Sequence, residues 1–376
     1  MLNHILRILV LLLGITLLVS CKNSMDVSKK EIVTKTVNLP YSQHIKMVDI
    51  NAGWLVVVDP KPRLLRTTNG GVTWKDVTPP EKISSPFYLL NDNFVWFTTK
   101  ENENKEITFS NNGGQTWEKS IPFLSDSQII GLYFLDENNG WMTNFVKGIG
   151  AGGSQIELAE TSNGGKTWRI QSNEQLGNEI PYDGYKSFAV FSSKNQGWIS
   201  VIDSGNPWLY QTENGGINWV AYSLPTTKEM PINHYFEIFP PTFFNESDGV
   251  IPMYFISDQQ EIYLYFTKDS GKTWEISPGL RFPKNSDQSF DFKFDPTSLN
   301  NVWAVFDRKE LYYFNGEWRK VHSISQLVTG NNKILTFDFI NETEGWIIIG
   351  NEEGATMFRT TNSGESWEKV VIESIN

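Results

Sequence analysis

The sequence lacks features that several classes of protein require. One cysteine in 376 residues excludes an intramolecular disulfide and any metal or redox site built from several cysteines. The 32 Lys and Arg residues are outnumbered by 43 Asp and Glu, and the net charge of −11 argues against nucleic acid or anionic lipid as the main partner. The few histidines are isolated (His44, His234 and His322 beyond the first twenty residues), so we expect no metal site and no cofactor.

The first twenty residues contain the one strongly apolar run. Residues 8–19 are too few to span a bilayer, and their length is typical of the apolar region of a signal peptide. The run ends at Leu18-Val19-Ser20-Cys21, which resembles the lipobox of bacterial lipoproteins. That resemblance implies cleavage before Cys21 and lipidation of this residue. We therefore expect a signal peptide over 1–20, a lipidated Cys21 with a tether over 21–40, and an extracytoplasmic protein anchored to a bacterial membrane only through its lipid. The alternative is an ordinary secretory signal with a chance cysteine.

An octapeptide repeat dominates the rest of the chain. It ends in tryptophan and is rich in Thr, Asn and Gly, residues that favour tight turns. A shortened relative, Asn315–Trp318, adds a seventh copy, and the seven tryptophans lie 43 to 55 residues apart. The six full copies are TTNGGVTW (67–74), SNNGGQTW (110–117), TSNGGKTW (161–168), TENGGINW (212–219), TKDSGKTW (267–274) and TTNSGESW (360–367).

A second tryptophan precedes the turn in six of these seven units. It begins an apolar run, as Gly140-Trp141 and Gly197-Trp198 illustrate, whereas the fifth unit has Gly249-Val250. Unit four reads as strands over 186–191, 198–202, 208–212 and 219–224, separated by short polar turns. Four short strands repeated in this way are typical of a propeller blade. The sequence thus predicts an all-β fold, a seven-bladed β-propeller of four-stranded antiparallel blades over 41–376.

The octapeptide resembles the Asp box, or BNR repeat. Five of the six full copies carry Asn at the acidic position, and Asp269 alone keeps the acid. Turn chemistry accounts for these residue types without a ligand, so we predict structural roles for Asp269 and for the repeat tryptophans Trp74, Trp117, Trp168, Trp219, Trp274 and Trp367.

Together with the second tryptophan, the repeat resembles the photosystem II assembly and stability factor family. That resemblance implies protein partners at the cell envelope and a non-catalytic binding or assembly scaffold, with no catalytic residue assigned. A photosynthetic role does not follow, because the sequence shows no arginine-rich patch. The alternative is a glycan-binding or glycoside-hydrolysing, sialidase-like propeller, which would need a suitably spaced pair of carboxylates.

A candidate binding face follows from propeller topology. The loops that join strand two to strand three lie on the face opposite the octapeptide turns. Asp59, Asp203 and Asp307 follow the second strand at nearly the same repeat position, where Asp is also a good turn residue. We place on this face Asp59, Arg63, Asp203, Trp208, Asp258, Asp307 and Arg308.

Overall fold

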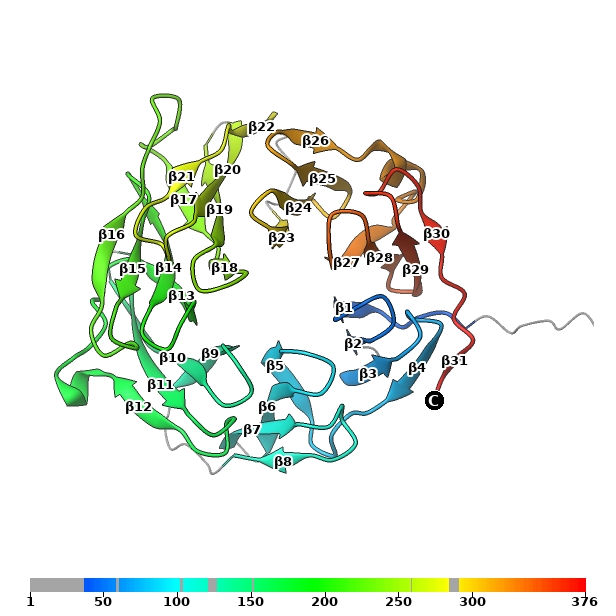
Figure 1. Ribbon diagram of the computed structural model, residues 1–376, viewed down its shortest axis with the longest axis horizontal. Helices are drawn as coiled ribbons and strands as arrows, with labels where there is room; N and C mark the ends of the chain where they lie inside the picture. The colour runs from blue at the N-terminus through cyan, green and yellow to red at the C-terminus, as the bar shows by residue number, and fades with distance from the viewer. Residues whose placement is uncertain are drawn as a thin grey trace, which may run out of the picture. The chain divides into compact units, whose positions relative to one another are not determined.

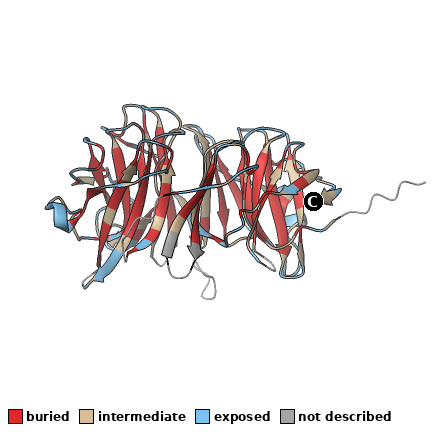
Figure 2. Ribbon diagram, turned by 90° about the horizontal axis from the view of Figure 1, so that it is seen from below, coloured by how far each residue is buried: buried red, intermediate tan, exposed pale blue. Residues whose placement is uncertain are grey.

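The computed structural model describes residues 37–58, 61–101, 104–120, 127–150, 152–257, 259–283 and 291–376. These residues belong to one compact unit, Thr36–Asn376, in which antiparallel sheets form a ring around a central axis (Figure 1). Buried residues concentrate in the strands, and exposed residues lie mainly in the loops of the two faces (Figure 2). The fold is therefore an all-β propeller, as the repeat predicts.

Five sheets are single blades of four antiparallel strands that run outward from the axis in chain order, and one of them, the sheet of unit one, carries a fifth strand at its outer edge. Units one to three include β1 (Ser42–Met47), β2 (Gly53–Val57), β3 (Arg63–Thr67) and β4 (Thr73–Asp76), then β5 (Ile83–Leu89), β6 (Val95–Glu101), β7 (Asn104–Ser110) and β8 (Glu118–Lys119), then β9 (Gln128–Phe134), β10 (Gly140–Ile149), β11 (Gly153–Thr161) and β12 (Arg169–Ser172). Units six and seven comprise β23 (Phe292–Ser298), β24 (Asn301–Phe306), β25 (Glu310–Phe314) and β26 (Trp318–Lys320), then β27 (Lys333–Phe339), β28 (Gly345–Asn351), β29 (Gly354–Thr360) and β30 (Glu368–Lys369).

Units four and five share one ten-stranded sheet, so the structure differs from seven separate blades. The sheet joins because β17 pairs with β14 on one side and β19 on the other; Ile202 of β14 lies opposite Glu237 of β17. Its strands are β13 (Tyr185–Phe191), β14 (Gly197–Ser204), β15 (Trp208–Thr212), β16 (Val220–Ser223), β17 (Tyr235–Ile238), β18 (Thr242–Phe243), β19 (Gly249–Ile256), β20 (Gln259–Thr267), β21 (Glu275–Ile276) and β22 (Leu280–Pro283). The described residues also include two short 3-10 helices, η1 (Glu174–Leu176) and η2 (His322–Gln326).

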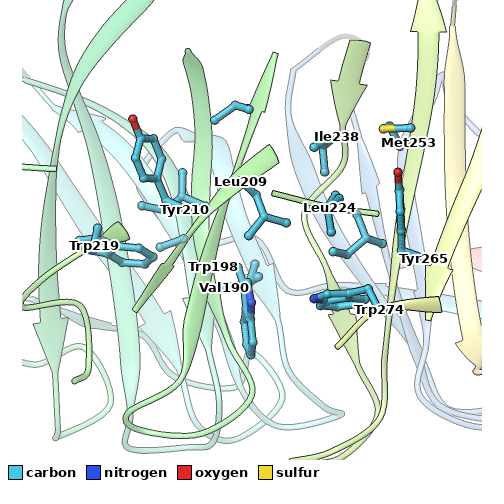
Figure 3. Close-up of a cluster of buried hydrophobic side chains, with 14 of the residues drawn as sticks. Val190, Trp198, Leu209, Tyr210, Trp219, Leu224, Ile238, Met253, Tyr265 and Trp274 are labelled. Atoms are coloured by element: carbon cyan, nitrogen blue, oxygen red, sulfur yellow. The ribbon is translucent and has the colours of Figure 1, made fainter. Parts of the chain in front are cut away.

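The second-strand tryptophans hold neighbouring units together. Trp96 of β6 stacks on Phe134 of β9 with ring centroids 3.6 Å apart, and Trp303 stacks on Phe339 at the same distance. A Cβ at Gly140 would lie 2.5 Å from the Phe134 ring, so the glycine before the next tryptophan leaves room for this phenylalanine. Figure 3 shows the corresponding core between units four and five, where Trp198 and Trp274 lie among aliphatic side chains such as Leu209 and Leu224. The core therefore lies mainly between the sheets.

The two ends of the described chain meet where the ring closes. The strand β31 (Ser374–Ile375) adds a parallel strand to β4 of unit one, so the first sheet has five strands. On the other side, Leu39 exchanges two backbone hydrogen bonds with Ala355 of β29, and Val37 N–H donates to Ile372 O at 3.0 Å. Leu39 is buried, so the end of the segment predicted to be a tether packs against unit seven.

Candidate functional site

The six full octapeptides form one type of turn between the third and fourth strands. In each, the hydroxyl of the first residue accepts the N–H of the fifth at 2.8–3.0 Å. The side chain of the third residue accepts the N–H of the seventh at 2.9–3.0 Å. Asp269 makes these bonds in the same way as the five asparagines, because the turn requires an oxygen acceptor rather than a charge.

The turn tryptophans differ in burial and in hydrogen bonding. Trp74, Trp219 and Trp274 are buried, while Trp117, Trp168 and Trp367 keep part of their surface exposed. The indole N–H of Trp117 donates to Val77 O, and those of Trp219, Trp274 and Trp367 also find acceptors. Among the described residues, the indole N–H groups of Trp74 and Trp168 find none, so the turn does not require that bond.

The predicted binding-face residues come from different units and contact partners close to them. Arg63 of β3 donates to Asp76 of β4 at 3.4 Å. Trp208 Nε1 donates to Asp203 Oδ2 at 3.0 Å, which joins two predicted residues at the β14–β15 turn. Arg308 forms an ion pair with Asp291, the residue before β23. Asp59, Asp258 and Cys21 lie outside the described residues. Arg63, Asp203, Trp208 and Arg308 therefore interact with side chains close to them in the fold.

Arg308, one of the predicted binding-face residues, lines a cavity on the predicted face. We call this cavity the loop cleft, and its volume is about 530 Å³. It is formed by the β24–β25 turn, the β28–β29 turn and the segment before β27, together with Tyr41. Asp307 and Arg308 hold positive φ angles of 49° and 54°, a conformation that non-glycine residues seldom adopt. The polar residues of the cleft are Tyr41, Arg308, Lys309, Asn331, Asn332, Lys333, Asn351, Glu352 and Glu353.

A second group of polar residues, which the sequence analysis does not identify, lies at one repeat position of the innermost strands. This residue is the register partner of the second-strand tryptophan: Lys46 pairs with Trp54, Asp295 with Trp303 and Asp338 with Trp346. The same position holds Tyr88, Tyr133 and Val190 in units two, three and four. The detectable signal is simple, because each of these residues precedes its tryptophan by eight positions.

We call Lys46, Asp295 and Asp338 the axial cluster. Lys46 Nζ donates to Asp338 Oδ1 at 2.9 Å, and Met47 N–H donates to Asp338 Oδ2 at 2.7 Å. Phe339 N–H donates to Asp295 Oδ2 at 2.6 Å, which repeats the Met47 bond one unit earlier. Each carboxylate therefore accepts a backbone N–H from the next unit. We call the register partner of the second-strand tryptophan the axial position; the unit that follows Asp338 has a lysine there, and the unit that follows Asp295 does not.

Burial and neighbouring charges shift the pKa values of this cluster. Burial first, and then repulsion from Asp338, raises the pKa of Asp295 to about 7, although Lys46 opposes this rise. Burial also raises the pKa of Asp338, opposed by the hydrogen bonds from Lys46 and Met47. Attraction to Asp338 raises the pKa of Lys46, whose side chain keeps 40% of its surface accessible. Burial lowers the pKa of the nearby His44 to about 4, so this imidazole is neutral at pH 7.

The axial cluster borders a smaller cavity of about 260 Å³, which we call the axial cavity. Lys46, Asp295 and Thr297 are its polar side chains, and Val48, Leu90, Pro296, Phe339 and Ile340 contribute apolar walls. Its residues lie toward the ends of first strands, before the turn into strand two. By strand topology, this cavity opens on the face of the octapeptide turns, opposite the loop cleft.

The part of the chain that the structure describes contains no group of three or more His, Cys, Asp or Glu residues placed to hold a metal ion. No helix in this part of the chain is long and apolar enough to cross a membrane.

Comparison with solved structures supports the propeller fold. The structure described as YCF48 bound to D1 peptide is 17% identical, with a TM-score of 0.54 over 87% of this chain and 94% of that chain. A PL25 ulvan lyase is 10% identical with a TM-score of 0.45, over 75% of this chain and 81% of that one. The GH93 alpha-L-arabinofuranosidase of Fusarium graminearum is 12% identical with a TM-score of 0.42, over 73% and 90%. No protein family model matches the sequence. At these identities the likeness to YCF48 shows a common fold.

Proposed function

We propose that this protein is a non-catalytic scaffold that binds a segment of a partner protein at the cell envelope. The observation that carries the proposal is the fold likeness to YCF48, which is bound to a peptide in its structure. The loop cleft supports it, since its charged side chains and carboxamides provide donors and acceptors for a peptide backbone. Its volume also lies within the range of about 300–1,000 Å³ that is common for ligand sites.

The proposal includes the architecture predicted from the repeat. The ten-stranded sheet contains two octapeptide turns, Thr212–Trp219 and Thr267–Trp274, and two first strands, so we count it as two blades fused through β17. With the five single blades this gives a seven-bladed Asp-box propeller. Such a fusion is favourable because an edge strand exposes unpaired backbone N–H and C=O groups, which a strand of the neighbouring blade can pair.

The proposal also includes the anchor. Lipidation of Cys21 would hold the protein at the outer side of a bacterial membrane, as the likeness of residues 18–21 to a lipobox suggests. The N-terminal segment reaches the ring at Val37–Leu39, beside Ala355 at the start of β29. The β28–β29 turn before Ala355 also lines the loop cleft, so the first described residues of the chain lie beside the cleft.

Site-specific photo-crosslinking in the native envelope tests this function. A photoreactive amino acid replaces Asn331 in the loop cleft of the full chain, and a matched variant carries it at Val220, an exposed residue of the outermost strand β16 that lines neither cavity. We expect a protein adduct of discrete mass from position 331 that position 220 does not give. No protein adduct at position 331, or the same adducts from both positions, would contradict the proposal. Enrichment of an envelope polysaccharide instead would favour the glycan-binding alternative.

A further inference from the structure

The axial position is not used uniformly around the ring. Units two, three and four fill it with Tyr88, Tyr133 and Val190, which shows that aromatic or apolar side chains suffice to pack there. The charged residues are confined to the consecutive units six, seven and one. Packing alone therefore does not explain why three ionisable groups are gathered on one side of the axis, where burial penalises charge.

Asp295 is the member of the axial cluster that lacks a cationic partner at the next position. The equivalent carboxylate of Asp338 accepts Lys46 Nζ at 2.9 Å as well as a backbone N–H. The next axial residue after Asp295 is Asp338 itself, a like charge. In the described residues, Asp295 accepts one hydrogen bond, from Phe339 N–H. With Asp295 ionised, the axial cluster carries one net negative charge.

The axial cavity gives a guest access to this carboxylate. Its volume of about 260 Å³ falls just below the range of pockets for drug-sized ligands but leaves room for one extended side chain. The walls are apolar at Val48, Leu90 and Ile340, while Asp295 and Thr297 offer oxygen atoms. Lys46 also lines the cavity, but its ammonium group is paired with Asp338, which leaves Asp295 as the carboxylate for a guest. An aliphatic stem that ends in a cationic group matches this combination, because such stems pack on apolar surface while the head binds an anion.

We propose that the axial cavity binds one cationic side chain, a lysine or an arginine, that projects from the partner protein and pairs with Asp295. This inference rests on the proposed protein-binding function and adds a second, charge-specific contact on the face of the octapeptide turns. The cationic group of the guest pairs with Asp295 as Lys46 Nζ pairs with Asp338, so the same kind of ion pair forms one unit earlier in the ring.

The proposal predicts the direction of the pH dependence. The guest binds the ionised form of Asp295, whose pKa is about 7, so affinity falls as the pH drops through 7 and the carboxyl takes up a proton. Binding of the guest must in turn lower that pKa. The charged and titratable groups around Asp295 and on the adjoining inner strands are Lys46 and His44 of β1, Tyr88 of β5, Lys293 of β23 and Asp338 of β27.

Titration with a small peptide tests the subsite on the full propeller. The probe is acetyl-Gly-Lys-Gly-amide, and its matched control carries acetylated lysine. Ligand-observed NMR at pH 8 measures the dissociation constants for wild type, Asp295→Asn and Asp183→Asn; the last removes an exposed carboxylate between β12 and β13. A charge-assisted hydrogen bond is worth about 1.5–3 kcal/mol. We therefore expect Asp295→Asn to weaken binding by about tenfold or more, whereas Asp183→Asn leaves it unchanged.

A second measurement on the wild-type protein guards against misfolding of the variant. The carboxyl carbon of Asp295, labelled with ¹³C, reports its protonation, and the lysine peptide should lower its apparent pKa. Equal affinity of wild type and Asp295→Asn, no binding of the probe, or an unmoved carboxyl titration would overturn the subsite. If position 331 gives a protein adduct and the peptide tests fail, the lysine subsite is refuted and the proposed scaffold function stands. If the probe binds as expected but position 331 gives no protein adduct, the proposed scaffold function is refuted and the subsite stands.

Discussion

At the scale of single residues, two sets of tryptophans with similar repeat spacing have different surroundings. Trp96 on β6 is fully buried, stacks on Phe134 and donates its indole N–H to Gly164 O at 2.8 Å. Trp168 in the octapeptide turn meets Phe134 edge-on at 5.9 Å and remains partly exposed. The second-strand tryptophan therefore contributes more to the contact between units than the more conspicuous turn tryptophan.

This difference predicts unequal costs of truncation. Trp96→Ala should lower the free energy of unfolding by about 3–5 kcal/mol, the usual range for a buried Trp replaced by Ala. Trp168→Ala should cost less, about 1–3 kcal/mol, because less of its surface leaves water. Urea denaturation followed by circular dichroism measures both. Equal costs, or a larger cost for Trp168→Ala, would show that the turn tryptophan dominates the contact.

The sequence identifies turn residues more readily than the residues of the axial cluster. The bonds of the octapeptide connect residues four positions apart, so a short motif suffices to predict them. Lys46 and Asp338, by contrast, are separated by 292 positions and meet only because the ring closes. Their alignment eight residues before a tryptophan is visible in the sequence, but their proximity depends on the order of the units around the axis.

At the scale of strands, the repeat predicts the blade accurately and the connection between blades poorly. The strands expected in unit four over 186–191, 198–202, 208–212 and 219–224 agree with β13, β14, β15 and β16 to within two residues at each end. Residues 203 and 204 extend β14 beyond the end of the expected strand, and together with Ile202 they pair with β17. A two-residue extension carries no periodic signal, so the fusion of the two sheets could not be predicted.

The strand β31 makes a specific prediction about ring closure. Deletion of residues 373–376 removes the bonds from Glu373 N–H to Val72 O, from Asn376 N–H to Trp74 O and from Asp76 N–H to Asn376 O. At about 0.5–1.5 kcal/mol each, their loss should lower the free energy of unfolding by about 2–4 kcal/mol. Thermal and urea denaturation measure the change, with Glu373→Ala as a control that keeps every backbone group. A truncated chain as stable as this control would show that β31 does not close the ring.

At the scale of the whole molecule, the propeller and the attachment that we propose for it depend on different parts of the chain. The described residues from Val37 onward form the ring, with Leu39 and Ile372 in one buried cluster between units seven and one. Composition and repeat are enough to predict a ring, because all seven units carry a turn tryptophan and six of them carry the full octapeptide. The attachment that we propose would depend on one residue, Cys21, and on its chemical modification, which no contact within the ring can reveal.

Substitution of that residue therefore tests attachment without changing the ring. Cys21→Ser should move the protein from the membrane fraction to the soluble fraction, because the apolar run over residues 8–19 is too short to span a bilayer and the thiol is the proposed site of the lipid. Ser24→Ala, three residues further on, is the matched control and should stay with the membrane. Fractionation followed by immunoblotting gives the distribution, and mass spectrometry of the N-terminal peptide shows whether the wild-type thiol carries a lipid. Equal membrane retention of Cys21→Ser, or an unmodified wild-type thiol, would replace the lipid anchor with an ordinary secretory signal, while the fold of the propeller would be unaffected.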